Sequence, residues 1–278
     1  MKEDVYMLKS NRKNSDFISY LIPISCILMG YLLWRFVLGN ASGFTNPDKD
    51  NLFWPQHRGP IDAWNRMYEG GIIVPVLIGL LFIVVVFSIE RFITLSKAKG
   101  KGSNKEFVRK IQHYLSQKDL KSAFLECHAQ KGSLANVVLS GLESYEKMIT
   151  DTKLTTEKKV RVIQKKIDEA TSLELPIMQK NLTFLSTITS LSTLVALLGT
   201  VIGMIRSFAA LGEGGGAASA SELAVGISEA LYNTATGIAA SALSLVMYNI
   251  FTSKIDAITQ AIEEASFTLT QSFNSLYK

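Results

Sequence analysis

One long apolar stretch of the chain contains a single charged side chain. From Leu223 to Phe251 there are 29 residues, and Glu229 is the only Asp, Glu, Lys, Arg or His among them. A helix of this length, rising about 1.5 Å per residue, reaches about 43 Å, which exceeds the roughly 30 Å of hydrocarbon in a bilayer. The stretch therefore predicts a membrane-spanning helix.

Glu229 is the first candidate for a functional residue. A carboxyl two turns inside an apolar span is costly unless it is neutral, paired or next to a wet cavity, so such residues mark function by default. Apolar surroundings favour its neutral form, which suits a group that takes up and releases protons. The alternative is a structural acid that hydrogen-bonds a neighbouring helix.

The composition supports a membrane protein and excludes several other classes. Hydrophobic residues make up 47% of the chain and gather in long runs, and the net charge of +5 comes without aromatic-basic clusters that would bind nucleic acid. Cys26 and Cys127 are far apart, and the histidines are scattered, so we predict neither a disulfide nor a metal site or cofactor. The sequence has no nucleophile–base pair that would indicate an enzyme. It also has no inverted repeat that would indicate a secondary transporter.

The first half of the chain predicts two spans separated by an external linker. Residues 17–38 form an apolar run longer than a usual signal core, so we interpret them as a transmembrane helix, with a cleaved signal peptide ending near Asn40 as the alternative. The expected order is an N-terminal cytoplasmic segment (1–16), a transmembrane helix (17–38), a periplasmic linker in which Trp54 and Trp64 could sit on a short interfacial helix (39–70), and a transmembrane helix (71–95).

Charge sets the orientation of the region that follows. Four lysines come directly after the second span, and residues 96–180 carry 17 basic and 10 acidic side chains, which predicts a cytoplasmic location. Apolar residues recur at helical spacing in this region and again in a C-terminal cytoplasmic helix, 254–278. These predicted apolar stripes are Phe107, Ile111, Tyr114 and Leu115; Val160, Ile163 and Ile167; and Ile255, Ile258, Ile262 and Ala265.

The third span, 181–211, has a polar face. Ser186, Thr193, Thr200 and Ser207 recur every seven residues, which places them along one side of a helix. Hydroxyls of this kind either join helices in lipid or form a wetted pore wall. The sequence leaves both interpretations open.

The last two spans are predicted to be antiparallel neighbours. A glycine-rich periplasmic turn, 212–222, joins them, so counting from the turn puts Thr200 on the third span and Thr234 on the fourth span (223–253) at similar depth. Glu229 falls near the level of Arg206, with Asn233 one turn further along. This set has the parts of a proton relay. In the competing interpretation, Arg206 pairs with Glu229 and keeps it ionised, whereas we favour an Arg206 that snorkels towards the turn.

Several motifs in the last two spans resemble a known family. The runs Leu197–Ile205 (LLGTVIGMI) and Gly226–Leu231 (GISEAL), followed by Thr234-Ala235, Gly237 and Tyr248-Asn249, are similar to the ExbB/TolQ proton-channel family. The likeness covers residues 173–255 well and the cytoplasmic region only in general pattern. Flagellar stator subunits of the MotA kind are more distant, because their key proton acid lies on the partner.

The resemblance implies an all-α, polytopic inner-membrane protein whose long helices project into a cytoplasmic helical domain and which assembles as a ring. It implies a homopentamer around a pair of single-span partners of the ExbD/TolR type, coupling proton motive force through a TonB-like protein to outer-membrane transport, or through a TolQ-like role to envelope integrity. The family's functional residues map onto Glu229, Thr200 and Thr234 as the proton pathway, while Thr193, Ser207, Asn233 and Arg206 are possible secondary pore-lining residues. A structural scaffold for single-span helices is the remaining alternative.

The sequence also departs from the family pattern. Ser192–Ala196 stands where members usually have a proline-containing run, so a kink there is not expected. Arg206 adds a charge near the acid. The first span and the 39–70 linker are additions to the three-span topology of the shortest members.

Overall fold

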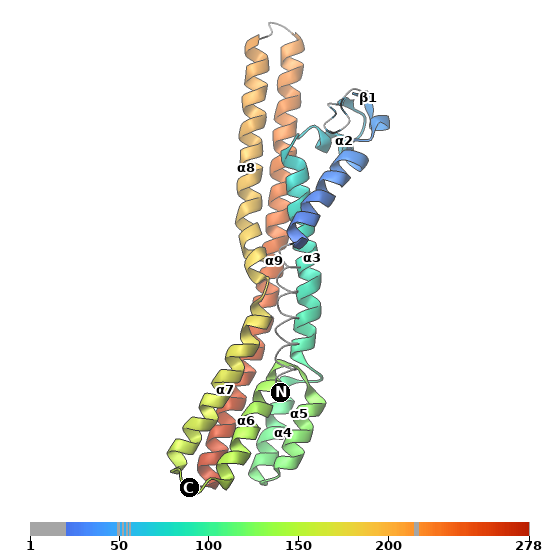
Figure 1. Ribbon diagram of the computed structural model, residues 1–278. Coiled ribbons are helices and arrows are strands. Elements are labelled where there is room, and N and C mark those ends of the chain that lie inside the picture. Colours follow the sequence, from blue (N-terminus) through green and yellow to red (C-terminus); the bar gives the residue numbers. More distant parts are fainter. Residues whose placement is uncertain are drawn as a thin grey trace. The chain divides into compact units, whose positions relative to one another are not determined.

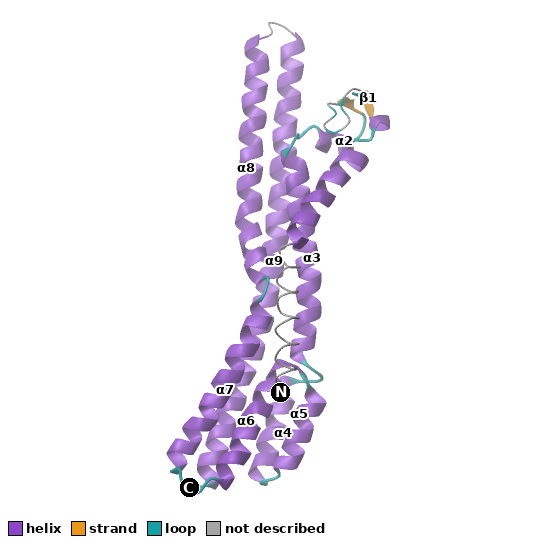
Figure 2. Ribbon diagram, viewed as in Figure 1, coloured by secondary structure: helices purple, strands orange, loops and turns teal. Residues whose placement is uncertain are grey.

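The structure is a computed structural model that describes residues 21–48, 51, 53, 55, 57–213 and 217–277. Helices dominate the described chain (Figure 2), and four are long and apolar enough to cross a membrane, as the sequence predicts. The expected segment 1–16 and the first residues of the 17–38 span lie outside the described residues. The chain divides into two compact units, Met1–Ser88 with Phe184–Tyr248 and Ile89–Thr183 with Asn249–Lys278.

The first unit is built on two long antiparallel helices, α8 (Leu182–Glu213) and α9 (Ala217–Leu276), which lie side by side (Figure 1). The glycine-rich turn between them is shorter than predicted. Helix α8 continues to Glu213 and α9 starts at Ala217, so most of the expected turn 212–222 is helical, and 214–216 lie outside the described residues.

Small residues hold α8 and α9 close together. A Cβ added at Gly237 would lie 2.2 Å from the Ala196 Cβ, and one at Gly203 would lie 3.0 Å from the Ala230 Cβ. Ser244 Oγ also donates a hydrogen bond across the pair, to the Leu185 carbonyl (2.7 Å). Close backbone approach and interhelical hydroxyl bonds are the usual means of joining helices in lipid, where no hydrophobic force drives them together.

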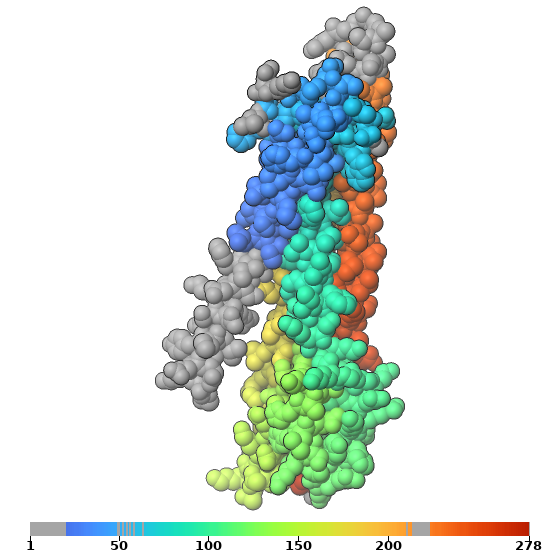
Figure 3. All heavy atoms as spheres, turned by 90° about the vertical axis from the view of Figure 1, so that its right-hand side faces the viewer, coloured from blue at the N-terminus to red at the C-terminus, as the bar shows by residue number. Residues whose placement is uncertain are grey.

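A third helix, α3 (Ile73–Lys99), and the helix over residues 21–33 complete the membrane part of this unit. The 21–33 helix continues as a π-helical turn, η1 (Trp34–Leu38), and Figure 3 shows it lying along the first half of α3. Their contact is again a glycine pair, because a Cβ at Gly30 would lie 2.6 Å from the Gly79 backbone nitrogen.

The linker folds into a small subdomain with two short strands, which the all-α prediction does not include. Its elements are η2 (Ala41–Gly43), β1 (Phe44–Asn46), β2 (Arg58–Pro60) and α2 (Ala63–Tyr68), with β1 and β2 antiparallel and Phe44 opposite Pro60. The subdomain closes over an aromatic cluster in which Trp34 stacks on Tyr68 at 4.3 Å between ring centroids. Trp64 lies on the short helix α2 and is 72% exposed, whereas Trp54 lies outside the described residues.

The second unit is a helical bundle whose predicted apolar stripes form its core. It contains the end of α3, α4 (Asn104–Ser116), α5 (Leu120–Gln130), α6 (Gly132–Thr150), α7 (Thr156–Gln179) and the C-terminal part of α9. Of the residues predicted to face inward, Tyr114 and Val160 are half-buried and the others are buried. The continuous 60-residue α9 confirms that the tail extends the last span as a helix.

A charged network donates hydrogen bonds to backbone carbonyls at the break between α7 and α8. Asn181 adopts a left-handed conformation (φ 63°) between these two helices. Arg91, which is buried, donates from Nη1 to the carbonyls of Ile177 (3.2 Å) and Met178 (3.3 Å) and also pairs with Glu90. The last carbonyls of a helix have no intrahelical donor, so a buried guanidinium provides the partners that the break removes.

Candidate functional site

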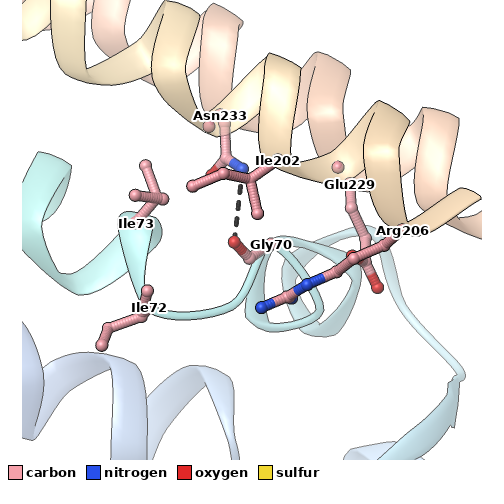
Figure 4. Close-up of a pocket in the computed structure, with 9 residues that line it drawn as sticks. Gly70, Ile72, Ile73, Ile202, Arg206, Glu229 and Asn233 are labelled. Atoms are coloured by element: carbon pink, nitrogen blue, oxygen red, sulfur yellow. Dashed lines mark hydrogen bonds between the residues drawn. The ribbon is translucent and has the colours of Figure 1, made fainter.

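Glu229 lines a small pocket in the first unit. The pocket has a volume of about 10 Å³ and lies where the N-terminus of α3 meets the α8–α9 pair. Figure 4 shows the Glu229 and Arg206 side chains pointing from α9 and α8 towards the segment that carries Gly70. The lining residues are Gly70, Ile72, Ile73, Gly199, Ile202, Gly203, Arg206, Glu229 and Asn233.

Asn233 is the most buried polar residue of this pocket. Its side chain is 2% exposed, and its Nδ2 donates to the Gly70 carbonyl oxygen at 3.2 Å. Its Oδ1 is buried and has no hydrogen-bond partner among the described residues. The amide therefore ties the segment before α3 to α9 and leaves one acceptor unused.

Arg206 and Glu229 share the pocket without a direct bond. Both line it, which confirms that they lie at a similar level. No hydrogen bond or ion pair joins these two side chains in the described part of the chain, and Arg206 is exposed, with Nη1 3.4 Å from the position of a Cβ at Gly71. Arg206 therefore lies beside the acid in the pocket without bonding to it directly, and its snorkelling towards the turn stays a prediction.

Thr200 and Thr234 meet across the α8–α9 seam. Their hydroxyls are hydrogen-bonded to each other, so the prediction that they lie at the same depth is confirmed. Each hydroxyl also lies within bonding distance of the carbonyl four residues earlier on its own helix, 3.1 Å for Thr200 and 3.2 Å for Thr234. A hydroxyl has one proton, so one threonine donates to the other while the second donates to its own helix.

The acid and the threonine pair occupy opposite flanks of the seam. Thr234 follows Glu229 by five positions, which at 3.6 residues per turn places them about 140° apart around α9. Between them lies the buried face of the helix, which carries Gly226, Ala230 and Gly237. Glu229 faces the pocket under Gly70, and neither threonine lines that pocket.

The predicted hydroxyl stripe drifts around α8. Ser186 and Thr193 are exposed, Thr200 is half-buried, and Ser207 is buried, with its hydroxyl donating to the Gly203 carbonyl at 2.8 Å. A repeat of seven falls short of two full turns by about 20°, so three repeats rotate the stripe by about 60°. Ser207 consequently packs at the seam against Gly226, where an added Cβ would lie 2.0 Å from its Oγ.

Sequence reasoning missed the contribution that the segment leading into α3 makes to this site. Gly70, Ile72 and Ile73 line the pocket, and Gly71 takes a positive φ of 70°. The Gly70-Gly71 pair before an apolar run was the available signal, because a Gly-Gly dipeptide marks a turn. Within the described ranges, no group of three or more His, Cys, Asp or Glu side chains could hold a metal ion.

Comparison with known proteins places this geometry in a family. Residues 129–264 match the model of the MotA/TolQ/ExbB proton channel family. The chain is 38% identical over 100 residues to the biopolymer transport protein ExbB of Helicobacter pylori, covering 68% of that protein and 36% of this chain. The chain belongs to the MotA/TolQ/ExbB proton channel family. With its four apolar helices, it is a multi-pass membrane protein.

Other relatives in this family match over shorter parts. An ExbB-like biopolymer transport protein of Synechocystis, ExbB-like 3, is 40% identical over 88 residues, which is 31% of this chain and 42% of that protein. The Tol-Pal system protein TolQ of Haemophilus influenzae is 35% identical over 91 residues, or 33% of this chain and 40% of that protein. The chain thus spans less than half the length of these two relatives.

Proposed function

We propose that this chain is the proton-channel subunit of an inner-membrane complex that couples proton motive force to TonB-dependent outer-membrane transport, with Glu229 as the residue that binds the proton. The observation that carries the proposal is that the single acidic residue of an apolar stretch lines a small cavity, in a chain of a proton channel family. An acid in such a setting can exchange a proton without leaving a permanent buried charge.

Thr200 and Thr234 belong to the proposed pathway as a second polar site, separate from Glu229. They lie on the other flank of the α8–α9 seam, so a proton moving between them and Glu229 passes through water or through another chain. A ring of five copies around a pair of ExbD/TolR-like single-span helices supplies such neighbours, and α8 and α9 are the helices proposed to face them. Thr193, a further exposed hydroxyl of α8, lies on the side of Thr200 away from the turn.

A TolQ-like role in envelope integrity is the second candidate, and the 35% identity to TolQ of Haemophilus influenzae supports it. Both roles use the same site and differ in the partner. The proposed orientation places the second unit and the C-terminus in the cytoplasm, following the basic residues after the second span. A scaffold role would rest on an Arg206–Glu229 ion pair, and no such pair joins these two side chains among the described residues.

A complementation experiment tests the proposal. In a host that lacks its own copy, the full chain with Glu229→Gln should fail to restore energy-dependent outer-membrane uptake. The Glu263→Gln variant, which carries the same change at an exposed position of α9, should restore it. Both variants should reach the membrane at the level of the unmodified chain. Restored uptake by Glu229→Gln would contradict the proposal, and leakage of periplasmic proteins with normal uptake in the deletion host would favour the TolQ-like role.

A further inference from the structure

The pocket beside Glu229 contains a polar atom whose surroundings point to a ligand. Asn233 Oδ1 is buried and lacks a hydrogen-bond partner among the described residues. A buried acceptor left unbonded destabilises the folded protein, and proteins usually satisfy such groups with a protein donor or an ordered water. The amide nitrogen already donates to the Gly70 carbonyl, so the amide group cannot rotate by 180° without losing that hydrogen bond.

The size and charge of the pocket limit what could bind there. Its volume of about 10 Å³ is close to what one water molecule requires, and its polar lining meets the second condition for a bound water. The Arg206 guanidinium disfavours a metal cation, and the Glu229 carboxyl disfavours an anion. Ile73, the first residue of α3, adds a helix N-terminus at the edge of the pocket, where backbone N–H groups lack intrahelical acceptors.

We propose that this pocket binds a single water molecule that donates a hydrogen bond to Asn233 Oδ1 and passes protons to Glu229 from the side of Gly70. The inference rests on the proposed function and adds the route by which protons reach the Glu229 carboxylate. In the transfer step, an O–H bond of the water breaks as an O–H bond forms on the Glu229 carboxylate. The water then regains a proton from water outside the pocket, so it is not consumed. Asn233 is a positioning residue in this scheme.

The pocket has an exposed side through which the bound water can regain a proton from outside water. Ile72 and Arg206 both line the pocket and are both exposed, Ile72 at 58%. A Cβ at Gly70 would lie 2.9 Å from Asn233 Oδ1 and 2.5 Å from Val74 Cγ2, so any larger residue at this position would fill the space beside the free acceptor.

Blocking the mouth of the pocket tests the route. The experiment uses the full chain, purified with its partners and placed in vesicles, with the substitution Ile72→Cys. The matched control is Ile61→Cys, because Ile61 is 57% exposed and does not line the pocket. A charged methanethiosulfonate reagent should reduce proton flux in the Ile72→Cys complex to the level of Glu229→Gln. It should leave the Ile61→Cys complex and the unmodified complex unchanged, since Cys26 and Cys127 are both buried. Unchanged flux after modification at position 72, or failure of the reagent to reach it, overturns the proposed route.

Water contact is measured independently of flux. In vesicles containing the full chain with labelled asparagine side chains, magnetisation from water should reach the Asn233 amide as rapidly as it reaches Asn274, which is exposed on the same helix. The Glu229→Gln chain should give the same result. Slow transfer to Asn233 overturns the bound water. If Glu229→Gln leaves flux unchanged while Asn233 contacts water, the proposed function fails and the water site remains.

Discussion

Glu229 and Thr234 lie on the same helix, five residues apart, and face opposite sides of the α8–α9 seam. Glu229 lines the pocket under Gly70, while Thr234 shares a hydrogen bond with Thr200. Glu229 and the threonine pair therefore have different neighbours, and substitutions at each should have separable effects on proton flux and on stability.

The hydroxyl pair should contribute measurably to the stability of the seam. Thr200→Val and Thr234→Val each remove one partner while keeping the shape of the side chain. Interhelical hydrogen bonds in membranes average about 0.6 kcal/mol, so we expect the two substitutions to show a coupling energy of about that size in unfolding experiments. Additive effects of the two substitutions would mean that the bond contributes nothing.

Glycine-to-alanine changes should have opposite signs at two positions in α8 and α9. At Gly237 the new Cβ would lie 2.2 Å from the Ala196 Cβ and 2.8 Å from the Ser192 carbonyl, so Gly237→Ala should destabilise the protein by about 1–3 kcal/mol. At Gly212, which is also helical, no atom of the described residues lies within 4 Å of the added Cβ, so Gly212→Ala should stabilise the protein by about 0.5–1 kcal/mol. Thermal unfolding in detergent measures both changes, and a loss of similar size at both sites would argue against the tight seam.

Arg91 should stabilise the second unit strongly. Arg91→Met leaves the carbonyls of Ile177 and Met178 and the carboxylate of Glu90 without this donor, at a cost of about 3 kcal/mol or more. Lys97→Met removes a positive charge from an exposed position of the same helix and should change stability by less than about 0.5 kcal/mol. Equal melting temperatures for the two variants would contradict the role of the network.

The linker subdomain should weaken in acid because of His57. Burial lowers the pKa of this side chain below its ordinary value, and Nδ1 accepts a hydrogen bond from the Asp48 backbone N–H at 2.9 Å, which requires an unprotonated nitrogen. The unfolded chain therefore binds a proton more readily, so this contribution to stability is complete above about pH 6.5 and is lost as the pH falls through the lower folded pKa.

Emission from Trp34, which stacks on Tyr68 in the same cluster, reports this transition. His57→Asn keeps an acceptor near the position of Nδ1 and has no group that titrates in this range, so it should remove the pH dependence. An equally pH-dependent signal from that variant would assign the effect to another group.

The helices could be predicted from the sequence because their signals are local. The spans, the inward-facing stripes such as Ile255 and Ile258, and the common depth of Thr200 and Thr234 all follow from apolar spacing or from counting residues back from a turn. Which flank a residue occupies does not follow in this way. Counting gives the depth of Glu229, but its direction depends on where α3 packs, and that contact is made by Gly70 and Asn233, 163 positions apart.

The linker was hard to predict for a similar reason. Its strands have three residues each, too few for an alternating pattern, and they are held by an aromatic cluster that draws on Trp34 in the preceding helix and Tyr68 in the following one. Long-range packing of this kind overrides local propensity.

Proton flux through vesicles containing the purified complex tests the central claim most directly. With an imposed pH gradient and membrane potential, the unmodified complex and the Glu263→Gln control should conduct protons, and Glu229→Gln should reduce the flux to that of empty vesicles. Flux through Glu229→Gln equal to that of the control would contradict the assignment of Glu229 as the proton-binding residue.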